Sequence, residues 1–391
     1  MNTIPYGRQD ISRADIEAVM AVLRSDFLTQ GPAIERFERS VAAYCGVRHA
    51  VAVCNATAAL HIACLAAGLG KGDTLWTSPN TFVASANCGL YCGASVDFVD
   101  IDPGTFNMDP SLLEDKLEKA AKSGKLPKIL VPVHFAGQSC DMEWIRRLAS
   151  KHGITVLEDA SHAIGARYRG KPVGSCEFSD MAVFSFHPVK IITTAEGGMI
   201  LTNRQDLYDR LIRLRTHGIT RDPSFMEGAS HGPWYYQQVD LGYNYRMTDM
   251  QAALGASQMT RLDSFVQRRT LLAARYDTAL AHLPVDVPGR DPEAASSHHL
   301  YVVRLGTDGA ADPAGFHRKV FEGLRAAGIG VNLHYIPVHT QPYYRKLGFR
   351  EGDFPIAEAY YRRAISIPLY PGMSDEDQDR VVAALKAQLA A

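Results

Sequence analysis

Lys190 lies in the stretch FSFHPVKIITTAEGG (184–198), between an apolar run and a turn of small residues. Lysine ammonium groups are rarely buried without a partner or a chemical role. A second apolar run, ITVLEDAS (154–161), contains Glu158 and Asp159 near its end. If both runs are strands, an amine and a carboxylate follow two strands of one sheet and can meet at its edge. Asp159 taken alone is explained as well by capping of a following helix.

The stretch CNATAAL (54–60) offers a place for a phosphate group. Its small residues lead from an apolar run into a helical pattern. The free N–H groups and the dipole of a helix N-terminus favour an anion. The hydroxyl groups of Thr57 and Ser185 can add hydrogen bonds to such an anion. Ordinary helix capping by Asn55 or Thr57 accounts for the same residues.

An amine, a carboxylate and a phosphate site together are what pyridoxal phosphate (PLP) requires. The lysine forms a Schiff base with the cofactor's aldehyde, and a carboxylate beside the pyridine nitrogen keeps the ring protonated as an electron sink. Phe82 falls at a further strand-to-helix turn, where its ring could stack on the cofactor. Core packing is at least as good an explanation of a single Phe. We predict PLP as cofactor, with Lys190 and Asp159 as catalytic residues.

The first two-thirds of the chain alternates short apolar runs with helical patterns, which predicts an α/β fold. Such alternation is typical of a mostly parallel sheet covered by helices on both faces, with ligands at the carboxyl ends of its strands. The expected strands are 49–55, 73–79, 94–102, 128–137, 154–161, 180–187 and 197–203. The expected helices between them are 56–69, 81–93, 111–124 and 142–153.

The pattern changes near residue 246. A long helical pattern over 246–283, in two segments joined near Gly255, precedes a Pro-rich link and a small α+β tail. We predict a large PLP-binding domain over 1–255, then over 256–391 a linking helix and a small α+β domain. The segment 218–239 has no clear periodicity and is expected to be a surface loop, a class of segment that is often functional.

Composition excludes several classes of protein. The chain has 391 residues and a net charge of −1, so no global field favours nucleic acid or an anionic membrane. Its seven cysteines form no CxxC pair, which argues against a zinc ribbon or a disulfide framework and fits a reducing compartment. The histidines of SHH (297–299) lack other ligands at metal spacing, so a linker role is predicted. With no signal peptide and no apolar run long enough for a membrane span, a cytoplasmic location is expected.

These motifs, in this order, resemble the DegT/DnrJ/EryC1/StrS sugar aminotransferases, which have the fold-type I architecture of aspartate aminotransferase. The resemblance implies that Lys190 forms the Schiff base and shuttles the proton, and that Asp159 partners the pyridinium nitrogen. It covers nearly the whole chain, through LTQGP (28–32), NATAAL (55–60), EDASHAIGA (158–166), FSFHPVKIITTAEGG (184–198), RTHG (215–218), GYNYRMTDMQAALG (242–255) and NLHYIPVH (332–339).

The resemblance also implies roles for other cofactor contacts. By position, Phe82 corresponds to the stacking aromatic residue and His162 to a residue near the cofactor's hydroxyl face. Thr57, Ser185 and the backbone at Ala56 correspond to the phosphate site. Asn244 corresponds to an asparagine that reaches the phosphate of the neighbouring subunit, which implies a homodimer with shared active sites. Many members carry glycine at the position of Ala56, and alanine is tolerable there unless positive φ is needed.

Within the family the chain most resembles the transaminases of pseudaminic acid synthesis. That resemblance implies transfer of an amino group from L-glutamate to C4 of UDP-2-acetamido-2,6-dideoxy-β-L-arabino-hex-4-ulose, giving UDP-4-amino-4,6-dideoxy-N-acetyl-β-L-altrosamine. The expected contacts to the sugar nucleotide are Thr29, Gln30, Arg246, His334, Tyr335 and His339. Each of these is explained equally well as a turn or strand-edge residue. Arg215 and Arg221 are further candidates for binding the diphosphate or the donor carboxylate, although Arg221 fits a solvated face better.

Three alternatives remain at this point. A related transaminase acting on a D-configured 4-keto hexose or a UDP-4-keto-pentose would share every catalytic residue. A sugar dehydratase of the same group usually carries histidine in place of the lysine, and Lys190 argues against it. A non-enzymatic module that keeps the fold would be expected to lose Lys190 or Asp159, and the chain has both.

Overall fold

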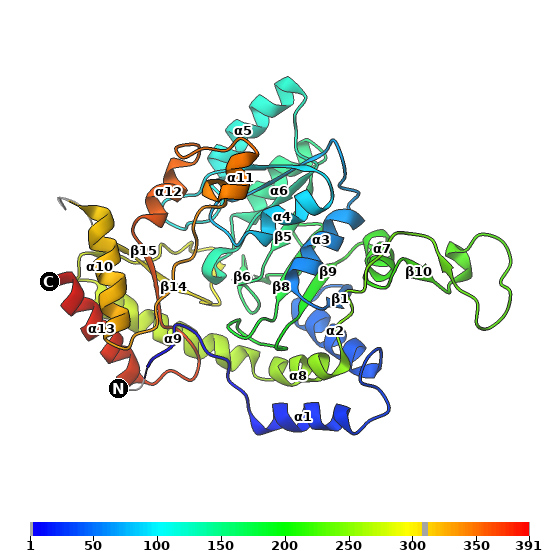
Figure 1. Ribbon diagram of the computed structural model, residues 1–391, viewed down its shortest axis with the longest axis horizontal. Coiled ribbons are helices and arrows are strands. Elements are labelled where there is room, and N and C mark those ends of the chain that lie inside the picture. The colour runs from blue at the N-terminus through cyan, green and yellow to red at the C-terminus, as the bar shows by residue number, and fades with distance from the viewer. Residues whose placement is uncertain (1–2, 307–311, 391) are drawn as a thin grey trace.

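A central sheet of seven strands organises the computed structural model, which describes residues 3–306 and 312–390 (Figure 1). The strands run in the order β1-β9-β8-β5-β4-β2-β3. All neighbours are parallel except β9, which is antiparallel to both β1 and β8, so the predicted mostly parallel sheet is confirmed. The strands are β1 (His49–Val53), β2 (Thr74–Thr77), β3 (Ser95–Phe98), β4 (Ile129–Val131), β5 (Thr155–Asp159), β8 (Met181–Ser185) and β9 (Gly198–Thr202).

Helices cover both faces of this sheet, because alternate strand residues are apolar in both directions. Val51 and Val53 pack with α3 (Ala56–Ala66), α4 (Ala84–Tyr91) and α7 (Gln205–Arg215). Ala50 and Ala52 point to the opposite face and pack with α2 (Pro32–Cys45) and α8 (Asp249–Met259). The far end of that second face is covered by α5 (Pro110–Ser123) and α6 (Met142–Lys151). Strands buried on both sides are expected of such sheets.

The C-terminal part has its own small sheet and core. Strands β12 (Val285–Asp286), β14 (Tyr301–Leu305) and β15 (Ala364–Ile367) are antiparallel. Helices α9 (Leu262–Leu280), α10 (Pro313–Ala326) and α13 (Asp375–Ala390) pack around them, while α11 (Pro342–Lys346) and α12 (Pro355–Tyr361) lie on the side of the large sheet (Figure 1). The N-terminal segment joins this part, since Ile4 pairs with Ile329. Helix α1 (Arg13–Leu23) then packs on α8.

The predicted division of the long helix into two segments is confirmed, but the join does not lie near Gly255. Gly255 lies inside α8, and the break falls between Met259 and Leu262. A β-carbon on Gly255 would lie 2.6 Å from the ring of Phe37, so glycine allows α8 to pack closely on α2 instead of ending the helix. The predicted domain boundary at residue 255 therefore falls within a helix, and the division into two domains stays a prediction.

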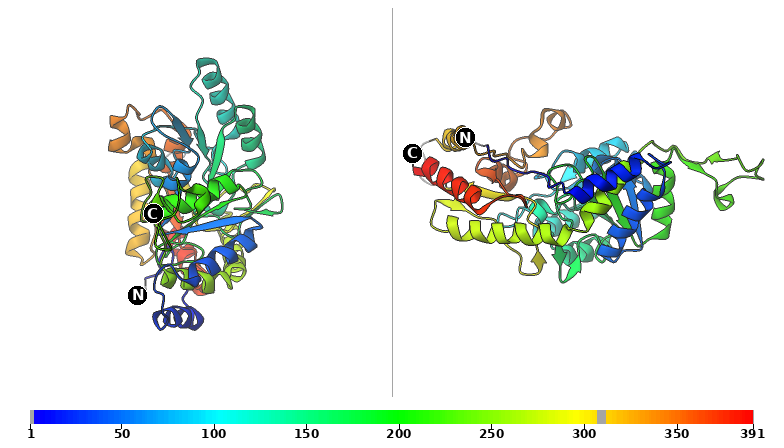
Figure 2. Two further views of the ribbon diagram at one scale, coloured as in Figure 1. Left: turned by 90° about the vertical axis from the view of Figure 1, so that its right-hand side faces the viewer. Right: turned by 90° about the horizontal axis from the view of Figure 1, so that it is seen from below.

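The segment 218–239, which we call the arm, projects from the body of the molecule (Figures 1 and 2). It contains a two-stranded ladder of β10 (Ile219–Thr220) and β11 (Gln237–Gln238) and a single 3₁₀ turn, Pro223–Phe225. Two further short strands, β6 (Arg167–Tyr168) and β7 (Lys171–Pro172), pair with β13 (Ala294–Ala295). No helix within the described residues is long and apolar enough to cross a membrane.

Arg269, in the middle of α9, is fully buried. Its Nη1 donates to the carbonyl groups of His298 and His299, each at 3.2 Å, and of Leu369 at 2.9 Å. Within the described ranges no carboxylate pairs with it, and burial lowers its pKa to about 9. The hydrogen bonds of Arg269 thus hold residues 298–299 and the segment just after β15 against α9.

We expect Arg269→Met to lower the free energy of unfolding by about 3 kcal/mol, because three buried carbonyl groups lose a charged donor. Urea unfolding measures this. The neighbouring Arg268 forms a partly exposed pair with Asp375, so Arg268→Met should cost about 1 kcal/mol or less. Equal losses in the two variants would contradict the role given to Arg269.

Candidate active site

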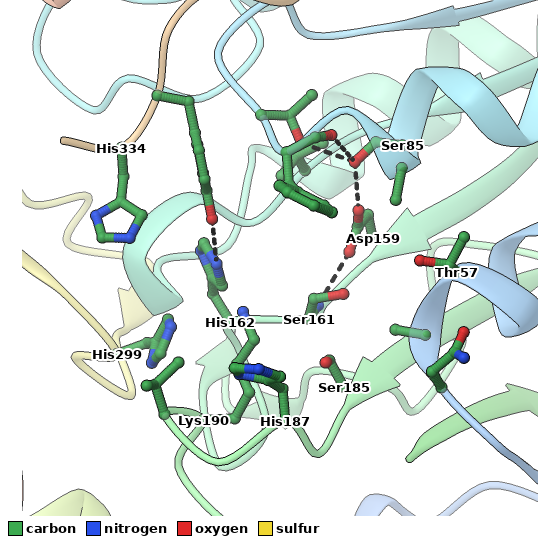
Figure 3. A pocket seen from close by; sticks show the side chains of 18 of the residues that line it. Thr57, Ser85, Asp159, Ser161, His162, Ser185, His187, Lys190, His299 and His334 are labelled. Atoms are coloured by element: carbon green, nitrogen blue, oxygen red, sulfur yellow. Dashed lines mark hydrogen bonds between the residues drawn. The ribbon is translucent and has the colours of Figure 1, made fainter. Parts of the chain in front are cut away.

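A cavity of about 600 Å³ opens at the carboxyl ends of β5 and β8, next to the start of α3 (Figure 3). Seven of the residues predicted to bind or act on the cofactor line it. They are Ala56, Thr57, Phe82, Asp159, His162, Ser185 and Lys190. The predicted substrate contacts His334 and Tyr335 line it as well. Residues far apart in the sequence therefore meet at the edge where a parallel sheet presents its ligands.

The turn after β8 holds Lys190 in this cavity. Its backbone N–H donates to the carbonyl of His187 at 2.9 Å. Downstream, the Thr193 hydroxyl and the Thr194 N–H both donate to the carbonyl of Phe186, at 2.9 and 3.0 Å. Burial lowers the pKa of Lys190 to about 8, and the carboxylate of Asp159 opposes part of that shift. At pH 7 about a tenth of an amine with this pKa is neutral, which is roughly 300-fold more than at the ordinary value of 10.5. The neutral form is the one that acts as a nucleophile or accepts a proton.

Asp159, the last residue of β5, is held by two donors. One carboxylate oxygen accepts from the Ser85 hydroxyl at 2.6 Å, and the other accepts from the Ser161 N–H at 3.1 Å (Figure 3). The side chain is 5% exposed. Hydrogen bonds to a buried carboxylate fix its direction. Asp159 can therefore face a protonated ring nitrogen without rearrangement.

The start of α3 provides the expected anion site. Asn55 caps the helix by accepting from the Ala58 N–H at 2.8 Å. The N–H groups of Ala56 and Thr57 have no acceptor among the described residues. Ala56 is the first residue of α3 and does not have positive φ, so alanine causes no strain there. A β-carbon on Gly198 would lie 2.6 Å from the Asn55 carbonyl, so glycine lets β9 pass behind the helix start.

These groups fit PLP. Unpaired N–H groups at a helix start, with the hydroxyls of Thr57 and Ser185 beside them, suit a phosphate. The amine of Lys190 and the fixed carboxylate of Asp159 suit the aldehyde and the ring nitrogen. Phe82 lines the cavity with 57% of its surface exposed, which leaves a ring face open to a flat ligand.

His162 is neutral and oriented. Its Nδ1 accepts from the Ala136 N–H at 3.3 Å, so the ring proton is on Nε2, which donates to the Tyr335 hydroxyl oxygen at 3.0 Å (Figure 3). Burial lowers the pKa of His162 well below its usual range, and the nearby Lys190 lowers it further. The Tyr335 O–H is then free to donate into the cavity.

Five predicted site residues do not line the cavity. Thr29 and Gln30 are exposed at the surface, where Thr29 pairs with Thr248. Arg246 pairs with Val53 at the end of β1, and the neighbouring Asn244 is exposed. The fifth is His339.

His339 is corrected by the structure. Its Nε2 is 2.9 Å from Glu358 of α12, and its side chain is fully buried beside the rings of Phe98 and Phe354. The residue joins α12 to the large sheet, a position that does not favour the predicted contact with a sugar. Arg215 is also occupied elsewhere, because its Nη1 is 2.6 Å from Glu38.

Several cavity residues were not predicted from the sequence. Ser85 and Ser161 hold Asp159, and Tyr6 enters from the N-terminal segment. His299 belongs to the stretch predicted as a linker, yet its ring lines the cavity. The role of Ser161 could have been predicted from the sequence, because it lies two residues after Asp159, the carboxylate to which its N–H donates. The remaining cavity residues outside the prediction include Glu196 and Asn332.

Comparison with known proteins agrees with this site. The family model of the DegT/DnrJ/EryC1/StrS aminotransferases matches residues 9–386, and the chain belongs to that family. Together with the site geometry, this makes the protein a pyridoxal-phosphate-dependent aminotransferase with a fold-type I architecture. The predicted family, fold class and cofactor are confirmed.

Particular relatives cover nearly the whole chain. The spore coat polysaccharide biosynthesis protein SpsC of Bacillus subtilis is 41% identical over 387 residues, spanning 98% of this chain and 96% of SpsC. PseC of Helicobacter pylori, an aminotransferase of pseudaminic acid biosynthesis, superposes with a TM-score of 0.90 at 29% identity and covers 100% of both chains. Spr1654 of Streptococcus pneumoniae in its PLP form gives 0.88 at 30% identity, covering 99% of each chain.

The lowered pKa of Lys190 predicts a pH profile for cofactor capture by the apo-protein. Only the neutral amine attacks an aldehyde, so the rate should rise with pH and level off with a midpoint of about 8 instead of the ordinary 10.5. Stopped-flow absorbance after mixing with PLP measures the rate. Because Asp159 raises the pKa of Lys190, Asp159→Asn should move the midpoint lower. A midpoint near the ordinary value would contradict the burial of this amine.

Proposed function

We propose that the protein transfers an amino group from L-glutamate to C4 of a UDP-linked 4-keto-6-deoxy sugar. The specific substrate that we favour is UDP-2-acetamido-2,6-dideoxy-β-L-arabino-hex-4-ulose, and the product is UDP-4-amino-4,6-dideoxy-N-acetyl-β-L-altrosamine. Support comes from the full-length similarity to H. pylori PseC, whose pathway is that of pseudaminic acid. The observation that carries the proposal is the Lys190 amine, with lowered pKa, facing a cavity that also holds Asp159.

Three residues of the cavity have separate roles in amino transfer. Bound PLP supplies a carbonyl carbon for the amino group and a ring that stores an electron pair. With PLP bound, Lys190 would hold the cofactor, and its amine, once free, would accept the proton from the α-carbon of the amino donor. With the keto-sugar the same amine would move a proton in the opposite direction. Asp159 would keep the ring nitrogen protonated, and Phe82 would cover one ring face against water.

A related sugar-nucleotide aminotransferase, acting on a D-configured 4-keto hexose or a UDP-4-keto-pentose, is the second candidate. It would use the same Lys190 and Asp159. The 41% identity to SpsC, a protein of spore coat polysaccharide synthesis, supports a sugar substrate without specifying the pseudaminic route.

The substrate assignment predicts a preference between two sugars. With glutamate as donor, UDP-4-keto-6-deoxy sugars of L-arabino and D-xylo configuration should differ in kcat/KM by at least about tenfold in favour of L-arabino. Mass spectrometry of the amino sugars measures both rates. Lys190→Ala is the control and should aminate neither sugar. Preferential amination of the D-xylo sugar would favour the second candidate.

We further propose a homodimer with shared active sites, located in the cytoplasm. The arm carries exposed Trp234 (72%) and Tyr236 (51%), and Leu241 beside it is 78% exposed, which is apolar surface that a second subunit would cover. Asn244 follows the arm, is exposed and does not line the cavity of its own subunit. These positions support a contact from Asn244 to the phosphate in the neighbouring site. The seven free cysteines support a reducing compartment.

Mixed dimers test the sharing of sites. Lys190→Ala and Asn244→Asp should each reduce activity by tenfold or more as homodimers, the second because a carboxylate repels phosphate. Refolding the two together should restore activity to a fraction of the dimers, since the Asn244→Asp subunit keeps its lysine and receives a normal Asn244 from its neighbour. No gain on mixing, with dimers present by light scattering, would mean that Asn244 does not act across the interface.

A further inference from the structure

Three buried histidines, His162, His299 and His334, lie close to Lys190 (Figure 3). Two of them have partners for both ring nitrogens. His162 accepts from the Ala136 N–H and donates to Tyr335. In His334, Nδ1 is 2.7 Å from the Ser366 hydroxyl and Nε2 is 3.5 Å from the Asn332 amide nitrogen. The ring nitrogens of these two histidines already have hydrogen-bond partners within the protein.

His299 differs from the other two. Neither of its ring nitrogens has a hydrogen-bond partner in the part of the chain that the structure describes, and its Nδ1 is completely buried. The residue is nevertheless well fixed, because its N–H donates to the Ala136 carbonyl at 2.9 Å and its own carbonyl accepts from Arg269. Its ring centroid is 4.4 Å from that of His162, and the side chain is 4% exposed.

The neutral ring of His299 carries one N–H group, and neither ring nitrogen has a partner among the described residues. An unpaired polar group in a buried position is costly, whichever of the two nitrogens holds the proton. The ring lines the cavity, so a bound ligand can supply the acceptor that this N–H group lacks.

The charges around His299 indicate which kind of ligand its ring N–H group can bind. Burial lowers the pKa of His299 well below its usual range, and His162, Lys190, Arg269 and His334 lower it further. No carboxylate among the described residues contributes to this shift, so the field at His299 favours an anion. Lys190 is the one lysine among the described residues that line the cavity, and no arginine lines it.

We propose that His299 binds the amino donor, donating a hydrogen bond from its ring N–H group to the donor's α-carboxylate. A carboxylate suits the surroundings of His299 better than an uncharged sugar oxygen, because it complements Lys190 and Arg269 as well as the free N–H. Binding also gives the orphan imidazole the partner that it lacks. This inference rests on the proposed use of an amino acid as donor, but it does not depend on which sugar is aminated.

Glutarate, which has two carboxylates and no amine to react, is the probe. Its Kd for the PLP-loaded enzyme can be measured by calorimetry for the wild type, His299→Leu and His299→Gln. Loss of a hydrogen bond to a charged group should weaken binding by about tenfold or more in His299→Leu. His299→Gln places an amide N–H near the position of Nε2 and should stay within about threefold of wild type. The Kd for UDP should not change in either variant.

His298→Gln is the matched control, because the adjacent His298 ring contacts Arg290 and does not line the cavity. It should bind glutarate as the wild type does. In separate half-reactions followed by absorbance, His299→Leu should raise the KM for glutamate and leave that for the keto-sugar unchanged. Wild-type glutarate affinity in a folded His299→Leu protein would overturn the proposal, and so would a defect confined to the sugar half-reaction. If no UDP-sugar is aminated but glutarate binding still depends on His299, the sugar assignment fails and this inference stands.

Discussion

Burial of the Lys190 amine is the interaction on which the rest of the site depends. An amine in water would be protonated at neutral pH and could neither attack a carbonyl carbon nor accept a proton. Burial brings its pKa to about 8, and the carboxylate of Asp159 limits the shift. Asp159 does not form an ion pair with Lys190 in the structure. Its oxygens are occupied by Ser85 and Ser161, which leaves it directed at the cavity and leaves the amine unpaired.

The sheet and its connections maintain this arrangement. The turn after β8 is closed by hydrogen bonds to Phe186, and β9 returns antiparallel behind it, next to β1. Gly198 allows that return to pass against Asn55, so the phosphate site at α3 and the lysine turn are packed on one another. Arg269 fastens the segment carrying His299 to α9 through backbone carbonyls. The same buried cation contributes to the field at His299 that favours an anion, so a structural anchor also shapes the electrostatics of the cavity.

Local sequence patterns were enough to predict the parts of the site that lie at strand ends and helix starts. Lys190, Asp159, Ser185 and Thr57 each follow or begin an element whose periodicity is readable, and the topology of parallel sheets brings such positions together. His299 and Ser85 had no such signal, since their place depends on how distant elements pack. His339 was assigned to the cleft from its motif, but its direction is decided by Glu358 on α12. Gly255 was read as a helix break, whereas it accommodates the ring of Phe37.

That Lys190 is the residue that holds the cofactor can be tested most directly by a chemical experiment. Borohydride reduction of the PLP-treated protein, followed by digestion and mass spectrometry, locates the lysine to which the cofactor becomes permanently attached. One labelled peptide is expected, with the pyridoxyl mass on Lys190. Attachment at another lysine, or an equal distribution over several surface lysines, would contradict it.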